Sequence, residues 1–480
     1  MDFKEGLTFD DVLLVPKRSP IVSRSQTDLR TRLSRNINLN IPLISANMDT
    51  VTESQMAIAL AREGGIGIIH RFMTIEDHVD QVLRVKRSES VIIEQPYTVK
   101  PDMTLADMHR LMAEYGVSGL LVEDKNNDNK LAGIITRRDV MFEKNGKRKV
   151  ADLMTKDVIT AKAGTTIEQA KEILHKHRIE KLPLIDSKGR ISGLITGKDI
   201  LKMDEYPHAA KDKKGRLLVG GAVGVKGDYL ERTEALLEAG ADTIVVDIAH
   251  GHSENAINTV KMIKKAFPAC DLIAGNVATG EGARDLIKAG VDAVKVGVGS
   301  GSICITRVVT GSGVPQLTAV IDAVKAAKEY DVPVISDGGI RTSGDLTKAL
   351  AAGASSVMVG SMFGGTDESP GKTLVKNGKK YKMYRGMASY MASLGRKYRE
   401  EGPQVVDSDD LNDYVPEGVE AMVPYKGSVV EIVRQLAGGL RSGLSYCGAK
   451  TIPEMQKNAE FVRITGAGFI ESQPHDVDVM

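Results

Sequence analysis

The sequence predicts an α/β fold, a (β/α)8 TIM barrel that carries an inserted tandem domain. Three observations support this prediction. Eight short apolar segments end in Gly, Asn, Asp or Ser, amphipathic patterns separate most of them, and a block with an internal repeat interrupts the series. Repeated alternation of strand and helix is typical of parallel β/α folds. A doubly wound sheet remains the alternative, because a count of strands does not show whether the sheet closes.

The expected strands are short and evenly distributed. They lie at residues 41–45, 65–69, 217–223, 243–248, 272–276, 293–298, 332–336 and 355–359. Between them, stretches such as 229–240 place apolar residues at helical spacing and end in glycine, which favours a helix C-terminus. A chain of 480 residues is longer than one compact core usually holds, so we expect more than one domain.

The composition excludes several classes of protein. Lys and Arg total 64 against 63 for Asp and Glu, so the net charge of +1 gives no electrostatic reason to expect nucleic acid. No apolar run approaches the roughly 20 residues that a membrane helix needs. The three cysteines have no paired spacing for zinc or a disulfide framework. We therefore expect a cytoplasmic protein without membrane or nucleic-acid partners.

The block between the second and third strands contains two similar halves. Residues 98–105 parallel 160–167, and residues 131–140 parallel 191–200. A regular repeat of this kind predicts a pair of equivalent modules. The expected domains are therefore residues 1–93 and 207–480 for the barrel and 94–206 for the insert. Residues 364–426 lack the barrel rhythm, and such a long irregular segment beyond a barrel strand favours an active-site flap.

Cys304 follows a glycine-rich run at the end of an expected strand. The thiol is either a nucleophile or a buried structural cysteine, and the loop alone does not decide between them. Gly338 and Gly339 after strand seven and Gly360 after strand eight expose backbone amides where TIM barrels commonly bind phosphate. Asp247, after strand four, offers a carboxylate for the diol of a sugar.

The assembled motifs resemble those of the IMP dehydrogenase / GMP reductase family. The matching segments are 46–53 (ANMDTVTE), the Cys304 loop, 337–340 (DGGI) and 384–387 (YRGM). The repeated insert resembles a tandem pair of CBS modules, a Bateman domain. In such domains the Thr-x-x-Asp step, here Thr136 with Asp139 and Thr196 with Asp199, contacts the ribose of an adenine nucleotide.

The resemblance implies that Cys304 attacks C2 of a purine 5′-monophosphate and that a hydride passes between C2 and a nicotinamide. Thr306 and Glu417 would relay a proton. The implied nucleotide-binding residues are Ser302, Asp337, Gly338, Gly339, Gly360, Ser361, Tyr384, Gly386, Met387 and Glu417. The implied residues on the NAD side are Asp247, Asn276, Gly297 and Gly299. The implied potassium ligands are Gly299, Gly301, Cys304, Glu471 and Ser472.

The sequence leaves three possible functions for the chain. Oxidation of IMP with NAD is favoured by the long flap, by Glu417 and by the tail at 466–472, which is similar to that of the dehydrogenases. Reduction of GMP with NADPH is the alternative, because the flap lacks the Arg-Tyr dipeptide usual in dehydrogenases; Arg399 or Arg396 would have to substitute for its arginine. The third is an inactive regulator that senses nucleotides. The resemblance also implies a homotetramer or octamer, with adenine or guanine nucleotides at the insert.

Overall fold

The computed structural model describes residues 3–89, 93, 96–124, 129–198, 200, 205–401, 415–474 and 477, without the side chains of 396–401. The chain forms two compact units. The larger consists of Met1–Ser88, His208–Asp212 and Leu217–Met480, and the smaller of Glu89–Pro207 and Lys213–Arg216.

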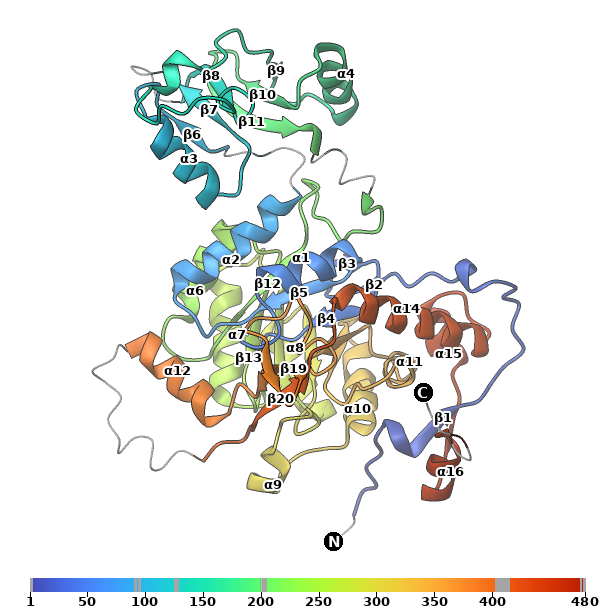
Figure 1. Cartoon of the computed structure of the whole chain (residues 1–480). Coiled ribbons are helices and arrows are strands. Elements are labelled where there is room, and N and C mark those ends of the chain that lie inside the picture. Colours follow the sequence, from blue (N-terminus) through green and yellow to red (C-terminus); the bar gives the residue numbers. More distant parts are fainter. Residues whose placement is uncertain are drawn as a thin grey trace. The chain divides into compact units, whose positions relative to one another are not determined.

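Eight parallel strands close into a barrel in the larger unit (Figure 1). Their order around the barrel is β12-β13-β14-β15-β16-β17-β4-β5. The bounds are β4 Leu43–Ser45, β5 Ile66–Ile69, β12 Val219–Val223, β13 Thr243–Asp247, β14 Leu272–Val277, β15 Ala293–Val296, β16 Val334–Asp337 and β17 Ser356–Val359. Each strand overlaps one of the eight expected segments. The closed order confirms the TIM barrel and excludes the doubly wound sheet.

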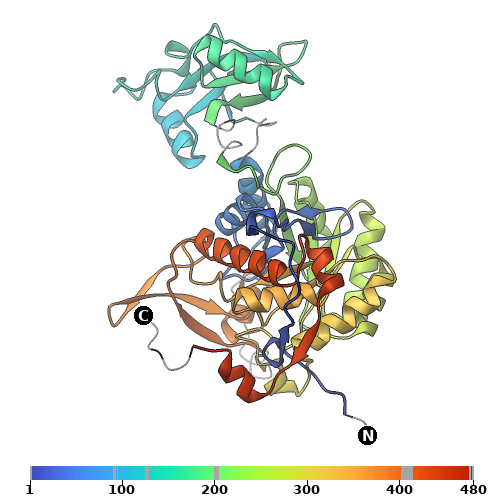
Figure 2. The same cartoon turned by 90° about the vertical axis from the view of Figure 1, so that its right-hand side faces the viewer.

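Side chains from every strand fill the interior of the barrel. This cluster includes Ile44, Ile68, Ala222, Val245, Ile273, Ala293, Ile335 and Met358, all of them buried. Helices surround the strands of the barrel (Figure 2). The alternating residues of these strands face outward toward the helices. The helices are α1 Ser54–Arg62, α2 Ile75–Ser88, α6 Tyr229–Glu238, α7 Glu254–Ala266, α8 Gly280–Ala289, α10 Gln316–Lys328, α11 Ser343–Ala351 and α14 Val429–Tyr446.

Helix starts follow from local capping. Ser253, Thr279, Thr342 and Ser428 accept hydrogen bonds from backbone amides of α7, α8, α11 and α14. Smaller elements complete the unit: η1 Phe9–Asp11, β1 Val12–Leu14, η2 Arg24–Gln26, β2 Thr31–Arg32, β3 Asn38–Leu39, α9 Thr306–Thr310, α15 Ile452–Asn458, β21 Phe461–Arg463 and α16 Gly466–Glu471. β1 pairs with β21 and β2 with β3, both antiparallel.

The segment after β17 contains regular structure, so the expectation of an irregular stretch over 364–426 is wrong for its described part. β18 Leu374–Lys376, β19 Lys379–Arg385 and β20 Glu420–Pro424 form an antiparallel sheet, and α12 spans Tyr390–Glu401. The buried Lys382 ammonium of β19 donates to the carbonyls of Thr366 and Ser369, both at 2.7 Å. These bonds fasten the sheet to the loop after β17. Residues 402–414 lie outside the described residues.

The smaller unit has two halves with the same topology. In the first, β6 Thr98–Val99, α3 Leu105–Glu114, β7 Gly119–Glu123 and β8 Leu131–Thr136 form a sheet in the order β6-β7-β8. In the second, β9 Ala161–Lys162, α4 Ile167–His177, β10 Lys181–Ile185 and β11 Ile191–Thr196 form the order β9-β10-β11. The first pair of strands is parallel and the second antiparallel in both halves. The 3-10 turn η3, Val150–Asp152, lies between the halves.

Candidate active site

The candidate site lies at the carboxyl ends of the barrel strands. Asp247 ends β13, Asp337 ends β16, and the Cys304 loop follows β15. Parallel strands bring these ends to one face of the barrel, where the loops of TIM barrels form their sites. Polar residues that are far apart in the sequence therefore come together here.

The Cys304 loop is held by the end of the flap. The amide of Ile305 donates to the carbonyl of Glu417 at 2.8 Å, and the amide of Val419 donates to the carbonyl of Ile303 at 3.0 Å. These bonds, with the bridge between Cys304 and Gly418, make a short antiparallel ladder. The ladder sets the position of the Glu417 side chain relative to the thiol.

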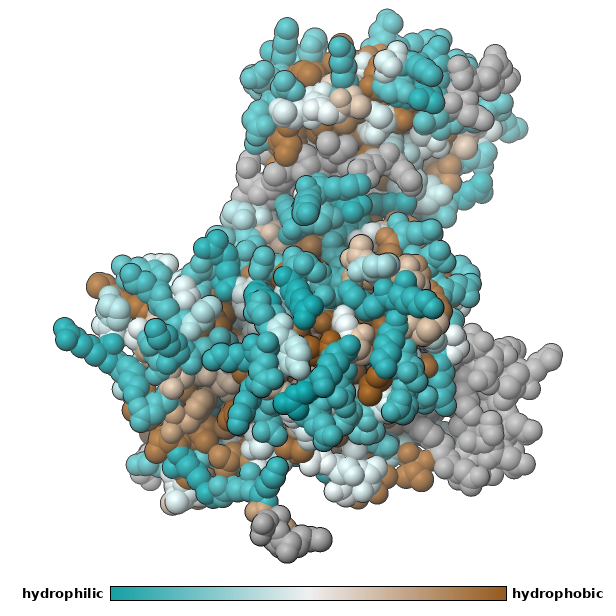
Figure 3. Space-filling view, turned by 180° about the vertical axis from the view of Figure 1, so that it is seen from behind, coloured by the Kyte–Doolittle hydropathy of each residue, from teal (hydrophilic) through white to brown (hydrophobic). Residues whose placement is uncertain are grey.

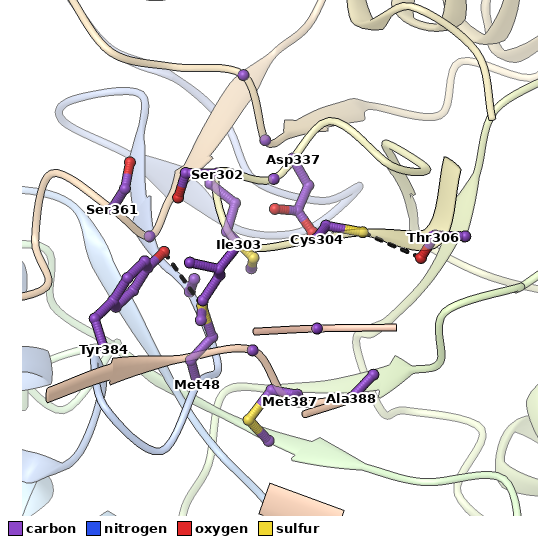
Figure 4. Close-up of a pocket in the computed structure, with 18 of the residues that line it drawn as sticks. Met48, Ser302, Ile303, Cys304, Thr306, Asp337, Ser361, Tyr384, Met387 and Ala388 are labelled. Atoms are coloured by element: carbon purple, nitrogen blue, oxygen red, sulfur yellow. Dashed lines mark hydrogen bonds between the residues drawn. The ribbon is translucent and has the colours of Figure 1, made fainter. Parts of the chain in front are cut away.

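The thiol, a hydroxyl and a carboxylate form a chain in this ladder. Cys304 Sγ lies 3.1 Å from Thr306 Oγ1, which donates to Glu417 Oε2 at 2.8 Å. All three residues are partly exposed at the cavity. Figure 4 shows the Cys304 thiol directed toward Thr306. A nucleophile beside a hydroxyl that is backed by a carboxylate is suited to covalent chemistry followed by proton relay.

One cavity, of about 200 Å³, lies beside the thiol on the side of β16, β17 and the flap. Gly338 and Gly339 have φ values of +99° and +78°, in the left-handed region that glycine enters without strain. A Cβ at Gly338 would lie 2.4 Å from Ser300 Oγ, so glycine is required there. Every residue expected on the nucleotide side lines this cavity: Ser302, Asp337, Gly338, Gly339, Gly360, Ser361, Tyr384, Gly386, Met387 and Glu417.

Tyr384 of β19 closes the far side of this cavity. Its hydroxyl lies 3.9 Å from Met48 Sδ (Figure 4). Burial raises the pKa of Tyr384 to about 12, although a hydrogen bond with Ser302 acts in the opposite direction. The phenol is therefore a neutral hydrogen-bonding group at physiological pH.

A second cavity, of about 350 Å³, shares the thiol with the first. Asp247, Asn276, Gly297 and Gly299, the residues expected on the NAD side, line it together with Arg71 and Ser300. At its base lies Lys295 of β15, whose side chain is 2% exposed. Burial would lower the pKa of Lys295, but Asp247 and Asp337 raise it overall, so the ammonium stays charged.

Arg307 of α9 supports the base of the catalytic loop. Its guanidinium donates to the carbonyls of Val314 at 2.6 Å and Val298 at 3.3 Å. Its stem fills the space beside Gly299 and Gly313, where an added Cβ would lie 2.5 and 2.6 Å from Arg307 Cγ. Both glycines are needed for the arginine to pass between them.

Some expected residues are not part of these cavities. Glu471 and Ser472, at the end of α16, line neither of the two cavities around Cys304. Arg399 belongs to α12, but its side chain lies outside the described residues. The described residues contain no group of His, Cys, Asp or Glu suited to a metal ion.

Lys295 was not predicted from the sequence. A lysine within the apolar strand 293–298 was the available signal, because a charged side chain in a buried strand needs partners. Arg71, after β5, was also missed, and no spacing in the sequence marks it. The two units contain no helix, within the described part of the chain, that is long and apolar enough to cross a membrane.

The barrel and its site define a class of enzyme in which a partly exposed cysteine, a hydroxyl and a carboxylate lie together beside a cavity lined by glycine turns. The family model of the IMP dehydrogenase / GMP reductase domain matches residues 6–475. The chain therefore belongs to the IMP dehydrogenase / GMP reductase family. This result confirms the resemblance drawn from the motifs.

Relatives of both named activities are similar over the full chain. The inosine-5′-monophosphate dehydrogenase of Nitrosopumilus maritimus is 69% identical and covers 100% of both chains. That of Bacillus subtilis is 52% identical over 99% of this chain and 96% of its own. A GMP reductase from Trypanosoma brucei bound to guanosine 5′-monophosphate has a TM-score of 0.93 and 47% identity, with 99% of each chain covered. The same enzyme bound to guanosine 5′-triphosphate has a TM-score of 0.82 and 43% identity, with 97% of this chain and 99% of that chain covered.

Proposed function

We propose that this enzyme oxidises IMP to XMP with NAD, as a step of guanine nucleotide synthesis. The observation that carries the proposal is the chain of contacts from Cys304 to Thr306 to Glu417, at 3.1 and 2.8 Å. The choice of dehydrogenase over reductase rests on the full-length relative at 69% identity.

The proposed reaction has two chemical stages. In the first, Cys304 Sγ adds to C2 of the purine and a hydride leaves C2, which produces a thioimidate. In the second, water adds to C2 and the C–S bond breaks, which releases XMP and the thiol. Thr306 accepts a proton from the water and passes it toward Glu417.

The second cavity has the lining that a dinucleotide requires. Asp247 and Asn276 offer polar groups for ribose hydroxyls, and Gly297 and Gly299 allow close approach of the backbone. Bound NAD supplies the hydride acceptor. The residues of the chain orient the purine so that C2 lies between the thiol and this cavity.

The proposed potassium site depends on the proposed assembly of several copies of the chain. Carbonyls of Gly299, Gly301 and Cys304 give only part of a potassium coordination shell, since Glu471 and Ser472 do not line the site of their own chain. The potassium proposal therefore requires these two residues to come from a neighbouring copy in a homotetramer or octamer. Exposed apolar side chains on β1, β21 and α16, such as Leu13, Val462 and Ile470, are candidates for such a contact. Figure 3 shows a mainly hydrophilic face with clusters of hydrophobic residues.

We also propose that the smaller unit, with boundaries near residues 94 and 206, is a Bateman domain that binds adenine or guanine nucleotides. The repeated topology supports the CBS assignment. The amide and hydroxyl of Thr136 both donate to Asp139 at 2.7 Å, an arrangement that presents the carboxylate beside the loop. Asp199 lies outside the described residues. A cytoplasmic location is proposed because the catalytic thiol must stay reduced.

Reduction of GMP with NADPH is the second candidate. It is favoured by the GMP reductase structures and by the absence of an Arg-Tyr dipeptide in the flap. An inactive nucleotide-sensing regulator is disfavoured, because the complete chain from Cys304 to Glu417 would serve no purpose in it.

Parallel assays separate the candidates. Purified enzyme is incubated with IMP and NAD, and separately with GMP and NADPH, with and without potassium. We expect XMP and NADH, faster with potassium, and a burst of NADH before slower turnover, since hydrolysis proceeds without the usual flap arginine. Consumption of NADPH only with GMP would establish the reductase, and no turnover in either assay would favour the regulator.

A further inference from the structure

Lys295 connects four consecutive barrel strands at their carboxyl ends. From β15, its ammonium donates to Asp247 Oδ1 of β13 at 2.6 Å and to Asp337 Oδ2 of β16 at 2.8 Å. It also donates to Asn276 Oδ1 of β14. A lysine has three N–H donors, so these three acceptors use all of them.

The bonds to Lys295 decide which carboxylate atoms remain available. Asp337 Oδ2 accepts from Lys295 and also from Asn276 Nδ2 at 2.9 Å, which leaves Oδ1 for other partners. The amide of Asn276 also donates to the carbonyl of Gly297 at 2.7 Å, so it is fixed on both sides. The two carboxylates are 24% and 21% exposed, whereas Lys295 is 2% exposed. The carboxylates face the cavities, and the almost fully buried lysine lies between them at the base of the second cavity.

The two carboxylates belong to different parts of the site. Asp337 lines both cavities, whereas Asp247 lines only the second. Both lie within 2.8 Å of a single ammonium, so one cation offsets most of the repulsion between them. Of the other groups around them, Arg71 acts on Asp247 through its charge and Asn47 hydrogen-bonds to it, while Tyr384 lies near Asp337.

We propose that Lys295 is a positioning residue that holds the nucleotide-side Asp337 and the dinucleotide-side Asp247 in one fixed arrangement, so that it sets the affinity for both substrates. The inference rests on the proposed function for the identity of the substrates. Its physical basis is independent of the direction of the reaction. Because Lys295 has no free donor, it acts through the aspartates and asparagine rather than on a substrate.

Loss of the ammonium has a specific electrostatic consequence. In Lys295→Met, two carboxylates would share a poorly solvated region, and their repulsion would raise the pKa of one of them. At low pH this carboxyl is protonated and the pair keeps a single negative charge. As the pH rises both become ionised, repel each other and leave their binding positions. The KM of the variant relative to wild type should therefore rise with pH.

Lys86 provides a matched control. It is also a buried lysine between two aspartates, at 2.6 Å from Asp242 Oδ2 and 3.1 Å from Asp212 Oδ2. Asp242 immediately precedes β13, whereas Asp247 ends it, so this pair lies at the opposite end of the barrel. Lys86→Met removes the same type of interaction without touching the site.

The test is steady-state kinetics of the full chain from pH 6 to 9, with thermal melting to establish folding. We expect Lys295→Met to raise the KM for both IMP and NAD about tenfold or more at pH 7, and increasingly with pH. Lys86→Met should lower the melting temperature but leave both KM values within about twofold of wild type. If Lys295→Met lowers only the melting temperature and leaves both KM values unchanged, the lysine is merely structural and the proposal is wrong.

A second comparison covers failure of Lys295→Met to fold. The single variant Asp247→Asn is compared with the double variant Asp247→Asn, Lys295→Met. Both keep only the Asp337 carboxylate, so the double variant avoids the repulsion between two carboxylates. We expect the lysine substitution to raise the KM for IMP in this background by a pH-independent factor; no change would overturn the proposal. If wild type does not oxidise IMP, the proposed function fails, and calorimetric binding of IMP and NAD to the same variants decides the role of Lys295.

Discussion

Arg385 and Asp49 form an ion pair that fastens the end of β19, within the flap, to the loop after β4. Arg385 Nε donates to Asp49 Oδ2 at 3.0 Å, and its Nη2 contacts the same oxygen. The side chains are 20% and 5% exposed. Since Tyr384 and Met387 flank the arginine and line the nucleotide-side cavity, the pair sets the position of both.

Asp49→Asn should therefore weaken binding of the nucleotide. The substitution keeps the shape of the side chain but removes the charge that holds Arg385, and we expect the KM for IMP to rise about tenfold. Steady-state kinetics at saturating NAD measure the effect. Glu431→Gln, which removes an exposed partner of Arg434 on α14, is the control and should change nothing. An unchanged KM in Asp49→Asn would show that the flap keeps its position without the pair.

Cys304 should be the thiol that reagents modify. Cys270 and Cys447 are buried, and burial raises the pKa of Cys270 to about 12, so its thiol stays protonated and unreactive. Brief treatment with iodoacetamide should alkylate Cys304 alone, as peptide mass spectrometry would reveal, and IMP should protect it. Cys304→Ala should abolish turnover yet still bind IMP, because most of the residues proposed to contact phosphate and ribose follow other strands. Near-normal turnover of this variant would refute the covalent mechanism.

Glu417→Gln should separate the two chemical stages. The amide keeps the hydrogen bond from Thr306 but cannot accept a proton, so release of the product should slow by about a hundredfold or more. The first burst of NADH should persist, because addition of the thiol and hydride transfer do not need this carboxylate. Rapid-mixing absorbance at the NADH band measures both phases. Equal slowing of burst and steady state would place Glu417 in the first stage instead.

The barrel was predictable because each strand is a short apolar run closed by a polar or glycine residue. Gly338, Gly339 and Gly360 were predictable because glycine turns follow strands seven and eight, whereas the flap residues Tyr384, Met387 and Glu417 were predicted only through the family resemblance. The antiparallel sheet of the flap was not predictable from the sequence, because β18 to β20 are largely exposed strands whose side chains show little apolar periodicity. Lys295 was missed because its three partners, Asp247, Asn276 and Asp337, meet it only when four neighbouring strands pair in the sheet. Interactions between distant strands leave no local pattern.

His78 should make the larger unit less stable in acid. It is buried in α2, and burial, followed by the charges of Arg232 and His70, lowers its pKa well below the ordinary value. Below about pH 6.5 the unfolded chain therefore binds a proton that the folded chain does not, and stability falls as the pH drops. Between pH 7.5 and 5.5 this loss amounts to about 1 kcal/mol.

His78→Gln isolates this contribution. Glutamine does not titrate, so the free energy of unfolding of the variant should fall by about 1 kcal/mol less than that of wild type over the same pH range. Urea unfolding at the two pH values supplies both numbers. His208→Gln, at an exposed position, is the control and should reproduce the wild-type difference. If the free energy of unfolding falls by the same amount in wild type and in His78→Gln, other groups cause the acid sensitivity.

Removal of the smaller unit should leave a folded and active barrel. The unit is inserted between α2 and β12, and the chain returns to the larger unit at His208. Lys86, just before the insertion, pairs with Asp212, just after it, so the two crossing points are fixed to each other within the larger unit. A short Gly-Ser linker in place of residues 89–207 should therefore close the gap without strain.

We expect the kcat for IMP oxidation by the shortened protein to lie within about twofold of that of the full chain. Adenine or guanine nucleotides should alter the activity of the full chain only. An unfolded or inactive product would show that the insert is structural. Equal responses of both proteins to these nucleotides would place the regulatory site in the barrel.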